Sequence, residues 1–301
     1  MRALLKELKE QEIPYHTDVD ARTLCTFRIG GTVALVIEPR CVGELQSAVA
    51  LCRTYGVSFE VLGNGSNVLF EDGYLSLAVI RTAALDAVRV FSNGVWAGCG
   101  VLLPRLCHSA ATHGLDGLTF ACGIPGTLGG ALKMNAGAHG KSISDVVKSV
   151  KYLDLNTAEI KTDFNLKKSA SYRKCGFCYE NKLFLSAELE LRGGETPARL
   201  LAEIRQLKAA RRASQPTDMP SAGCVFKRPY PELPIGKLLD ELGCKGMRVG
   251  GATVSERHAA FILNEGGASA ADVKKLMWEI QKKAEKERGM TLESEIRIIS
   301  G

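Results

Sequence analysis

Six glycines lie among residues 123–140, together with Thr127 and Asn135. Glycine lets main chain approach a ligand without a Cβ in the way, and consecutive free backbone N–H groups can surround an anion such as a phosphate. The apolar residues between the glycines, including Leu128 and Leu132, indicate a segment packed inside the protein and not a surface loop. The sequence therefore predicts that main chain lies against a bound ligand in this stretch.

A second glycine-rich loop, Gly63-Asn-Gly-Ser-Asn67, follows a predicted strand, as ligand loops do in α/β units. Its spacing is not the GxGxxG of dinucleotide-binding folds. Gly140-Lys-Ser142 resembles the end of a phosphate-binding P-loop, but Asn135 stands where that loop requires glycine. We therefore assign neither nucleotide motif, and both loops remain candidates for binding an anionic ligand.

The composition is that of an ordinary globular protein, with 24% charged and 46% hydrophobic residues and a net charge of +6. Acidic residues are interspersed among the basic ones, so we expect no nucleic-acid surface. No apolar run approaches the roughly 20 residues of a membrane helix, and residues 1–11 have the pattern of an amphipathic helix, not of a signal peptide. We expect a cytoplasmic monomer without membrane insertion.

The ten cysteines are scattered along the chain, with one close pair, Cys175 and Cys178. A single CxxC pair without a second pair is weak evidence for a metal site. The histidines also lack the spacing of metal ligands, so we predict no metal. Most of the thiols should be small buried apolar groups in a reducing compartment.

Apolar residues at helical or strand spacing define the elements that must position the two loops. Helices are predicted at residues 3–10, 42–55, 103–113, 196–212, 235–242 and 270–288. Strands are predicted at residues 33–37, 59–62, 77–80, 87–91, 95–99, 146–155, 183–191, 259–263 and 292–299. Ser269 and Asp272 have the spacing of a capping box at the start of the last helix, and Gly289 ends that helix.

Two prolines, Pro216 and Pro220, break the periodicity after residue 212. We therefore predict a first domain over residues 1–212, in two subdomains of about 1–62 and 63–212, and a second domain over residues 213–301.

Nine segments, taken together and in order, resemble those of the UDP-N-acetylenolpyruvoylglucosamine reductase family. They cover most of the chain, and the chain length is similar to the shorter, type II form. The segments are Thr26-Phe-Arg-Ile-Gly-Gly31, Gly63-Asn-Gly-Ser-Asn67, Gly123-Ile-Pro-Gly-Thr-Leu-Gly-Gly130, Met134-Asn-Ala-Gly-Ala138, Tyr172-Arg173, Ser221-Ala-Gly-Cys-Val-Phe-Lys-Arg-Pro229, Gly250-Gly-Ala-Thr-Val-Ser255, residues 258–264 and Leu292-Glu-Ser-Glu-Ile-Arg297.

The resemblance implies an α+β protein with an FAD-binding domain of the vanillyl-alcohol-oxidase (PCMH) type in two subdomains and a C-terminal α+β substrate-binding lobe. It also implies that NADPH reduces FAD and that the flavin N5 gives a hydride to the enolpyruvyl group of UDP-N-acetylglucosamine enolpyruvate. Protonation of the neighbouring carbon then yields UDP-N-acetylmuramate for peptidoglycan synthesis. No separate NADPH motif is visible, so we expect NADPH and the substrate to use one cleft in turn.

Three residues match catalytic positions of the family: Arg173, Cys224 and Glu295. Hydride addition beta to a carboxylate builds negative charge on that carboxylate, and a fixed guanidinium such as that of Arg173 can hold it. From the residues alone, Arg173 and Lys174 would be a surface basic pair. Strand alternation alone does not choose between Glu293 and Glu295. The resemblance selects Glu295 as the residue that stabilises the intermediate or handles its proton.

Two positions depart from the family pattern. Cys224 stands where the family usually has a serine that gives the proton to the carbanion. A thiol is the stronger acid, with an ordinary pKa of about 8.5, so we predict that Cys224 is the general acid; the alternative is a buried structural cysteine. Arg228 stands where many relatives have asparagine, which adds charge near the substrate diphosphate or carboxylate.

The remaining contacts also follow from the resemblance. Substrate contacts are predicted for Tyr172, Lys227 and Arg228. Flavin contacts are predicted for Asn64, Gly65, Ser66 and Asn67 at the diphosphate, for Gly123, Thr127, Gly129 and Gly130 at the diphosphate or ring, and for Asn135, Ala136 and Gly137 at the ring. His258 and Asn264 are expected to order the C-terminal lobe without a chemical step.

Two other functions stay open on the sequence. An FAD-linked sugar or alcohol oxidase would turn over with oxygen and without NADPH, and the presence of both Arg173 and Glu295 argues against it. A non-catalytic nucleotide- or RNA-binding protein would be colourless and would bind nucleic acid in a salt-dependent way. Only the positive charge supports that function. The absorbance spectrum of the purified protein distinguishes all three.

Overall fold

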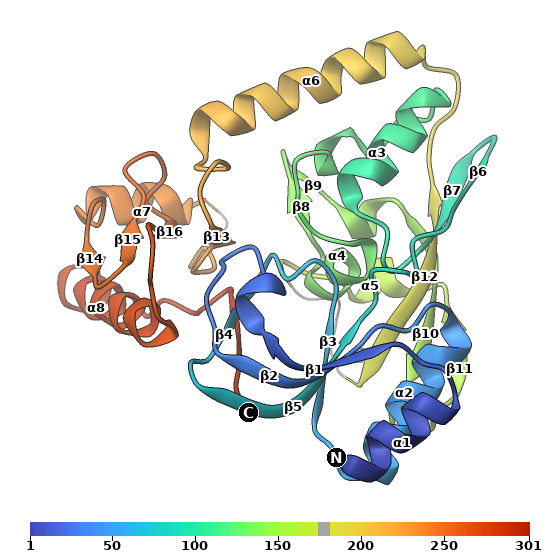
Figure 1. Ribbon diagram of the computed structural model, residues 1–301. Helices are drawn as coiled ribbons and strands as arrows, with labels where there is room; N and C mark the ends of the chain where they lie inside the picture. The colour runs from blue at the N-terminus through green and yellow to red at the C-terminus, as the bar shows by residue number, and fades with distance from the viewer. Residues whose placement is uncertain (174–180, 231) are drawn as a thin grey trace. The chain divides into compact units, whose positions relative to one another are not determined.

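The computed structural model describes residues 1–173, 181–230 and 232–301 (Figure 1). These residues form two compact units. Unit 1 comprises Met1–His16, Val36–Asn64 and Ala78–Ala210, and unit 2 comprises Thr17–Leu35, Gly65–Leu77 and Arg211–Gly301. Unit 2 therefore contains two N-terminal segments in addition to the region that the sequence predicts as a domain from residue 213.

Three larger sheets and two strand pairs form the β-structure of the described residues. The first sheet has the order β1 (Tyr15–Asp20), β2 (Thr32–Ile37), β5 (Tyr74–Arg81) and β3 (Phe59–Leu62). The second has the order β11 (Ile160–Asp163), β10 (Val147–Asp154), β12 (Lys182–Glu190), β7 (Gly94–Gly98) and β6 (Val88–Phe91). The third has the order β13 (Ser221–Cys224), β16 (Phe261–Asn264), β15 (Ala252–Val254) and β14 (Arg248–Val249). The pairs are β17 (Arg297–Ile299) with β4 (Val68–Phe70), and β8 (Gly137–Ala138) with β9 (Lys141–Ser142).

The helices differ widely in length. The α-helices are α1 (Arg2–Glu10), α2 (Val42–Thr54), α3 (Leu103–Thr112), α4 (Leu128–Met134), α5 (Leu166–Ser169), α6 (Pro197–Ser214), α7 (Ile235–Glu241) and α8 (Ala270–Arg288). Short 3₁₀ turns are η1 (Ala21–Thr23), η2 (Thr119–Ala121) and η3 (Ile143–Asp145). No helix among the described residues is long and apolar enough to cross a membrane.

The core of unit 1 is built on the five-stranded antiparallel sheet, against which α3 and α4 pack (Figure 1). Val95, Val150 and Leu189 from the sheet are fully buried, as are Leu106 of α3 and Leu132 of α4. Burial of apolar side chains from both layers supplies the main driving force for this packing. The glycine-rich stretch is therefore anchored in the core through α4.

In unit 2, α8 packs against β14 and β15. The predicted capping box begins this helix, because Ser269 Oγ accepts a hydrogen bond from the N–H of Asp272 (3.0 Å) while the Asp272 carboxylate accepts one from the N–H of Ser269 (3.0 Å). The helix ends, as predicted, at Gly289, whose left-handed conformation (φ 61°) suits glycine.

The sequence predicts most of these elements, but two expectations about the site regions are wrong. Only Arg297–Ile299 of the predicted strand 292–299 is a strand, and it pairs in parallel with β4, whereas Ser294 forms an isolated bridge with Phe226. The chain changes partner between these points and cannot keep one alternating ladder. The glycine-rich stretch also contains α4, a helix that the sequence does not predict.

Candidate active site

In unit 1, the two glycine-rich regions are in contact. The side-chain amide of Asn64 donates a hydrogen bond to the main-chain oxygen of Pro125 (2.5 Å). Gly63 lies so close to Thr127 that an added Cβ would be 2.2 Å from Thr127 Oγ1, so only glycine fits there. Gly123 is half-buried in the same loop. Two of the segments predicted to bind flavin are thereby brought together.

The first turn of α4 uses its N–H groups inside the protein. Leu128 and Gly129 donate to main-chain oxygens that precede α3 (2.8 Å in both cases), and Gly130 donates to the capping hydroxyl of Thr127 (3.4 Å). A row of free N–H groups, suggested by the glycine content, is thus not present at these three positions. Gly130 is exposed, and an added Cβ would meet only Thr127 Oγ1, at 3.6 Å. Packing does not require glycine there, which fits close approach of a ligand to the main chain.

Asn135 ends α4 in the left-handed region (φ 41°, ψ 57°) and is only 7% exposed. Its Nδ2 donates to the main-chain oxygen of Ser171 (2.9 Å), and its Oδ1 accepts from the N–H of Ser144 (3.2 Å). Ala136 follows with a main-chain hydrogen bond to α4, and Gly137 begins β8. The side chain of Asn135 therefore joins three segments of unit 1.

Arg173 lies two residues after Ser171 and also has a left-handed backbone (φ 57°). Non-glycine residues rarely adopt this region, and they do so mainly where surrounding contacts determine the conformation. The Arg173 guanidinium is 5.1 Å from the ring centroid of the exposed Tyr172, within the range of a cation–π contact. Lys174, Cys175 and Cys178 lie outside the described residues.

In unit 2, the second half of the other glycine loop packs on residues 24–26. Gly65 has φ 62°, an added Cβ would lie 2.1 Å from the main-chain oxygen of Leu24, and its own oxygen accepts from the N–H of Thr26 (3.1 Å). Ser66 is half-buried. Asn67 Nδ2 donates to the main-chain oxygen of Glu295 (3.0 Å). The loop therefore contacts the segment that carries a predicted catalytic acid.

Cys224 and Glu295 lie at neighbouring positions of one main-chain ladder in unit 2. Glu295 N–H donates to the oxygen of Val225 (2.9 Å), and Lys227 N–H donates to the oxygen of Glu293 (2.9 Å). On its other side, Cys224 is paired with Phe261 in β16. Both side chains are half-buried. The segments that carry two of the three predicted catalytic residues are thus held together by backbone hydrogen bonds.

Lys227 and Arg228 have different surroundings. The Lys227 side chain is 17% exposed and its ammonium forms an ion pair with the carboxylate of Glu293, which is 69% exposed. Arg228 is exposed. The sequence does not predict that Glu293 pairs with Lys227. The two residues are 66 positions apart, and the bridge between residues 226 and 294 brings them together. No local pattern signals such a pair.

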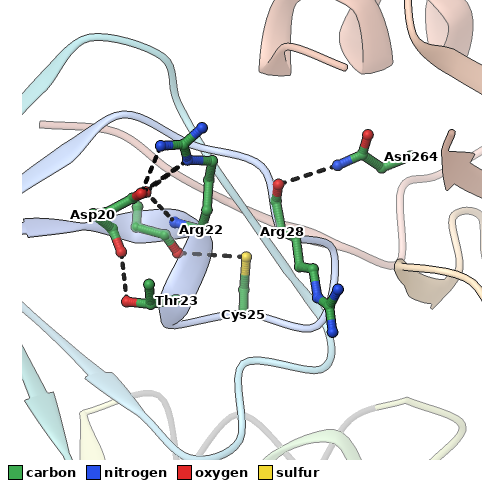
Figure 2. Close-up of polar contacts among 7 residues, drawn as sticks. Asp20, Arg22, Thr23, Cys25, Arg28 and Asn264 are labelled. Carbon is green, nitrogen blue, oxygen red and sulfur yellow. Dashed lines mark hydrogen bonds and ion pairs between the residues drawn. The ribbon is translucent and has the colours of Figure 1, made fainter. Parts of the chain in front are cut away.

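Asn264 connects two segments of unit 2 (Figure 2). Its Nδ2 donates to the main-chain oxygens of Phe27 (3.2 Å) and Arg28 (3.1 Å). Its Oδ1 accepts from the N–H groups of Gly266 (3.0 Å) and Ala268 (3.2 Å). Figure 2 shows the Arg28 guanidinium pointing away from this amide, and its backbone is left-handed (φ 54°). Asn264 therefore stabilises a strained turn next to the predicted flavin loop.

Most described thiols are buried apolar groups, as the sequence predicts. Of the eight described cysteines, six are buried, Cys41 is exposed and Cys224 is half-buried. Burial raises the pKa of Cys52 to about 11 and that of Cys99 to about 12. These thiols stay protonated at neutral pH and are poor nucleophiles.

Two family matches cover most of the chain. Residues 33–163 match the family described as FAD binding domain, and residues 215–299 match the UDP-N-acetylenolpyruvoylglucosamine reductase, C-terminal domain. The UDP-N-acetylenolpyruvoylglucosamine reductase of Carboxydothermus hydrogenoformans is 41% identical over 91% of this chain and 90% of its own length. That of Caldicellulosiruptor bescii is 38% identical over 97% of this chain and 93% of its own length.

Solved structures agree with these matches. The crystal structure of UDP-N-acetylenolpyruvylglucosamine reductase (MurB) from Thermus caldophilus has a TM-score of 0.79 and 31% identity, covering 95% of this chain and 98% of that one. A berberine bridge enzyme variant has a TM-score of 0.50 and 15% identity, covering 63% of this chain and 43% of that one, a likeness of fold alone. The protein has the predicted α+β fold, with a PCMH-type FAD-binding domain and a C-terminal domain. The chain therefore belongs to the UDP-N-acetylenolpyruvoylglucosamine reductase family.

Proposed function

We propose that this protein reduces UDP-N-acetylenolpyruvoylglucosamine to UDP-N-acetylmuramate, with NADPH as reductant and FAD as bound cofactor, in cytoplasmic peptidoglycan synthesis. Relatives with that reductase name support the substrate and reaction class. When bound, FAD would supply the redox chemistry, by taking up a hydride equivalent from NADPH and passing it to the enolpyruvyl group.

The residues of the two glycine regions fit a flavin. Gly63 and Gly65 keep the loop tight against the protein, and Gly130 leaves main chain uncovered where packing does not demand glycine. Asn64, Ser66 and Asn67 would bind the diphosphate, with Gly123, Thr127 and Gly129 beside it, and Asn135, Ala136 and Gly137 would be near the ring. Because the N–H groups at the start of α4 are occupied, the ligand would contact this helix at the exposed Cα of Gly130.

Arg173 would bind the carboxylate of the enolpyruvyl group. Charge develops on that carboxylate when a hydride adds beta to it, and a guanidinium already in position stabilises it without reorganisation. Its left-handed backbone and its place over the ring of Tyr172 support a preorganised side chain. Lys227 and Arg228 would contribute positive charge towards the substrate diphosphate, and Tyr172 a further contact.

The observation that carries the proposal is the pairing of residues 225–227 with 293–295. Because Glu295 N–H donates to the oxygen of Val225 (2.9 Å), the segment that carries the Cys224 thiol lies beside the segment that carries the Glu295 carboxylate. A thiol and a carboxylate on neighbouring segments suit protonation of the carbon next to the one that receives the hydride. Cys224 would give the proton, and Glu295 would stabilise the charged intermediate or handle the proton in turn.

An anaerobic absorbance titration of the purified protein tests the proposal. We expect visible flavin absorbance, its loss on addition of NADPH, and its return on addition of UDP-N-acetylenolpyruvoylglucosamine. Return of the absorbance with oxygen alone, at a rate that the enolpyruvyl substrate does not increase, would support an oxidase and contradict the proposal. A colourless protein that does not take up FAD would contradict it as well.

A further inference from the structure

Asn135 has a buried side-chain amide whose two ends are fixed by different partners. Its Oδ1 faces the N–H of Ser144 (3.2 Å) and its Nδ2 faces the main-chain oxygen of Ser171 (2.9 Å). A main-chain N–H can only donate and a main-chain oxygen can only accept, so these partners determine the orientation of the amide. In a flipped amide, the NH₂ group would face the N–H of Ser144 and the amide oxygen would face the main-chain oxygen of Ser171.

This amide is held rigidly from its own side. Asn135 is the left-handed end of α4, whose buried residues Leu128 and Leu132 anchor the helix in the core of unit 1. The β8–β9 hairpin then returns the chain to Ser144, with Ile143 N–H donating to the oxygen of Ala136 (2.9 Å). The Nδ2 group of Asn135 therefore reaches Ser171 from a part of the chain whose position is fixed by core packing.

Ser171 is separated from Arg173 by one residue. The direction in which an arginine side chain leaves the backbone depends on the dihedral angles of the residues just before it, and Arg173 itself has φ 57°. A shift of about 1 Å in a reacting group can lower a rate by roughly a hundredfold. Holding the oxygen of Ser171 thus fixes the start of the short segment that aims the guanidinium.

We propose that Asn135 is a positioning residue for Arg173, acting through its hydrogen bond to Ser171; this rests on the function proposed above. Both polar ends of the amide are used within the protein. Contact of Asn135 with a flavin would use its main chain, its van der Waals surface or the second N–H of its amide, which the hydrogen bond to Ser171 does not occupy. The role of the side chain lies in the step that uses Arg173, which is transfer to the enolpyruvyl substrate and not reduction by NADPH.

The test variant is Asn135→Asp in the flavin-loaded protein. A carboxylate keeps the acceptor for Ser144 and tolerates the left-handed backbone, but it loses the donor for Ser171 and repels that oxygen. We expect reoxidation of the reduced flavin by UDP-N-acetylenolpyruvoylglucosamine to slow by about ten- to a hundredfold. Reduction by NADPH should slow by much less than reoxidation, because the proposal gives Arg173 a role only at the carboxylate of the enolpyruvyl group.

Two further measurements separate positioning from general damage. A protonated carboxyl can again donate to Ser171, so the defect should shrink as the pH is lowered from about 8 to about 5.5, relative to the parent at each pH. In an Arg173→Lys background, Asn135→Asp should add little further slowing, since both changes act on one interaction. Asn93→Asp, with the same charge change in an exposed turn between β6 and β7, is the matched control and should behave as the parent.

Equal slowing of both half-reactions, or loss of flavin affinity with normal reoxidation, would overturn the proposal, as would fully independent effects of the two substitutions. If Asn135→Asp does not fold, Asn135→Gly, which keeps the left-handed backbone and lacks both amide ends, is measured in the same way. The proposed function is judged on the parent alone. A parent flavin that neither NADPH nor the enolpyruvyl substrate affects would contradict that function, whatever the variants do.

Discussion

The two units hold their candidate catalytic side chains by different means. In unit 1, the segment that leads to Arg173 is held by a side chain, the amide of Asn135, at the oxygen of Ser171 (2.9 Å). In unit 2, the segment of Glu295 is held by main-chain hydrogen bonds to the segment of Cys224, such as the one from Glu295 N–H to the oxygen of Val225 (2.9 Å).

This difference predicts how the positions of Arg173 and Glu295 respond to mutation of neighbouring residues. A hydrogen bond from a side chain, such as that of Asn135, can be removed by one substitution. Main-chain hydrogen bonds persist, because almost every residue carries the N–H and C=O groups that form them. Substitutions in unit 1 should therefore affect the geometry of Arg173 directly. Substitutions around the ladder of unit 2 should leave Glu295 in place and change the chemistry only when they remove a reacting group.

The largest effect is expected for Arg173→Lys. Lysine keeps the charge but lacks the planar fork that binds a carboxylate through two parallel hydrogen bonds. Reoxidation of the reduced flavin by the enolpyruvyl substrate should slow by roughly a hundred- to a thousandfold, while reduction by NADPH changes little. Rapid-mixing absorbance measurements follow the two half-reactions separately.

Arg192→Lys is the matched control, because the Arg192 side chain in unit 1 is 80% exposed and should tolerate the change. If Arg173→Lys slowed both half-reactions alike, Arg173 would act on the flavin or on the fold and not on the substrate carboxylate. The way in which the Arg173 segment is held in unit 1 would then have no specific consequence for transfer to the substrate.

Local patterns account for what the sequence could predict. Helix α8 has an apolar face that includes Leu276, a capping box and a terminal glycine, all of which act within a few residues. The buried glycine-rich stretch was also predictable, because its apolar residues are spaced through it. Its helix α4 was not, since two of its first three residues are glycine and the hydroxyl cap of Thr127 together with tertiary packing outweighs their low propensity.

Long-range pairings account for what the sequence could not predict. The partners of Asn67, Asn135 and Lys227 are 228, 36 and 66 residues away. The family resemblance suggests which residues react, but no local period indicates which main-chain oxygen an asparagine meets. The bounds of the two units show the same limit. Pro216 and Pro220 mark a break near residue 212, whereas three of the four earlier crossings lie inside the strands β1, β2 and β5, which carry no breaker, and the fourth lies in the glycine loop between Asn64 and Gly65.

The second largest effect is expected for Cys224→Ala, which removes the proposed proton donor. Reduction of the enolpyruvyl substrate should slow by about a hundredfold or more, and Cys224→Ser, with a hydroxyl donor in the same place, should keep most of the activity. Steady-state rates of NADPH oxidation with the enolpyruvyl substrate measure both variants. Cys41→Ser changes an exposed thiol in unit 1 and serves as control. A parent-like rate in Cys224→Ala would contradict the assignment of the general acid.

A smaller, pH-dependent effect on stability is expected at His258 in unit 2. Burial lowers the pKa of His258 below its ordinary value of 6.5, and its Nδ1 accepts a hydrogen bond from the N–H of Ala260 (3.3 Å). As the pH falls through 6.5, the unfolded chain binds a proton that the folded protein does not, so the free energy of unfolding decreases. The contribution of His258 is present above that value and is lost in acid.

His258→Asn keeps an acceptor for Ala260 without a titrating group. The variant should be less stable than the parent near neutral pH, because it loses the edge-on contact with Phe261 (5.0 Å between ring centroids). Its decline in acid should be shallower. Denaturant unfolding at about pH 7.5 and about pH 5.5 measures both differences. Parallel declines of variant and parent would show that another group causes the acid sensitivity of unit 2.

The smallest effect is expected for Asn67→Ala, the counterpart in unit 2 of a substitution at Asn135. The amide of Asn67 donates to the oxygen of Glu295 (3.0 Å), but the same segment is also held by Glu295 N–H on Val225 and by Arg297 N–H on the main-chain oxygen of Asn67, a group that alanine retains. At saturating FAD, reoxidation by the enolpyruvyl substrate should therefore slow by no more than about threefold.

The rate of reoxidation in Asn67→Ala is compared with the rate in Asn135→Ala, measured under the same conditions. If a main-chain ladder secures Glu295 and a side-chain clamp secures Arg173, the variant at Asn135 must be slower than the variant at Asn67 once both are saturated with flavin. FAD affinity is recorded for each, so that a lost diphosphate contact at Asn67 is not mistaken for a displaced Glu295. Equal slowing of the two variants would mean that the ladder does not make Glu295 independent of its neighbouring side chains, because the hydrogen bond from Asn67 would then matter as much as the one from Asn135.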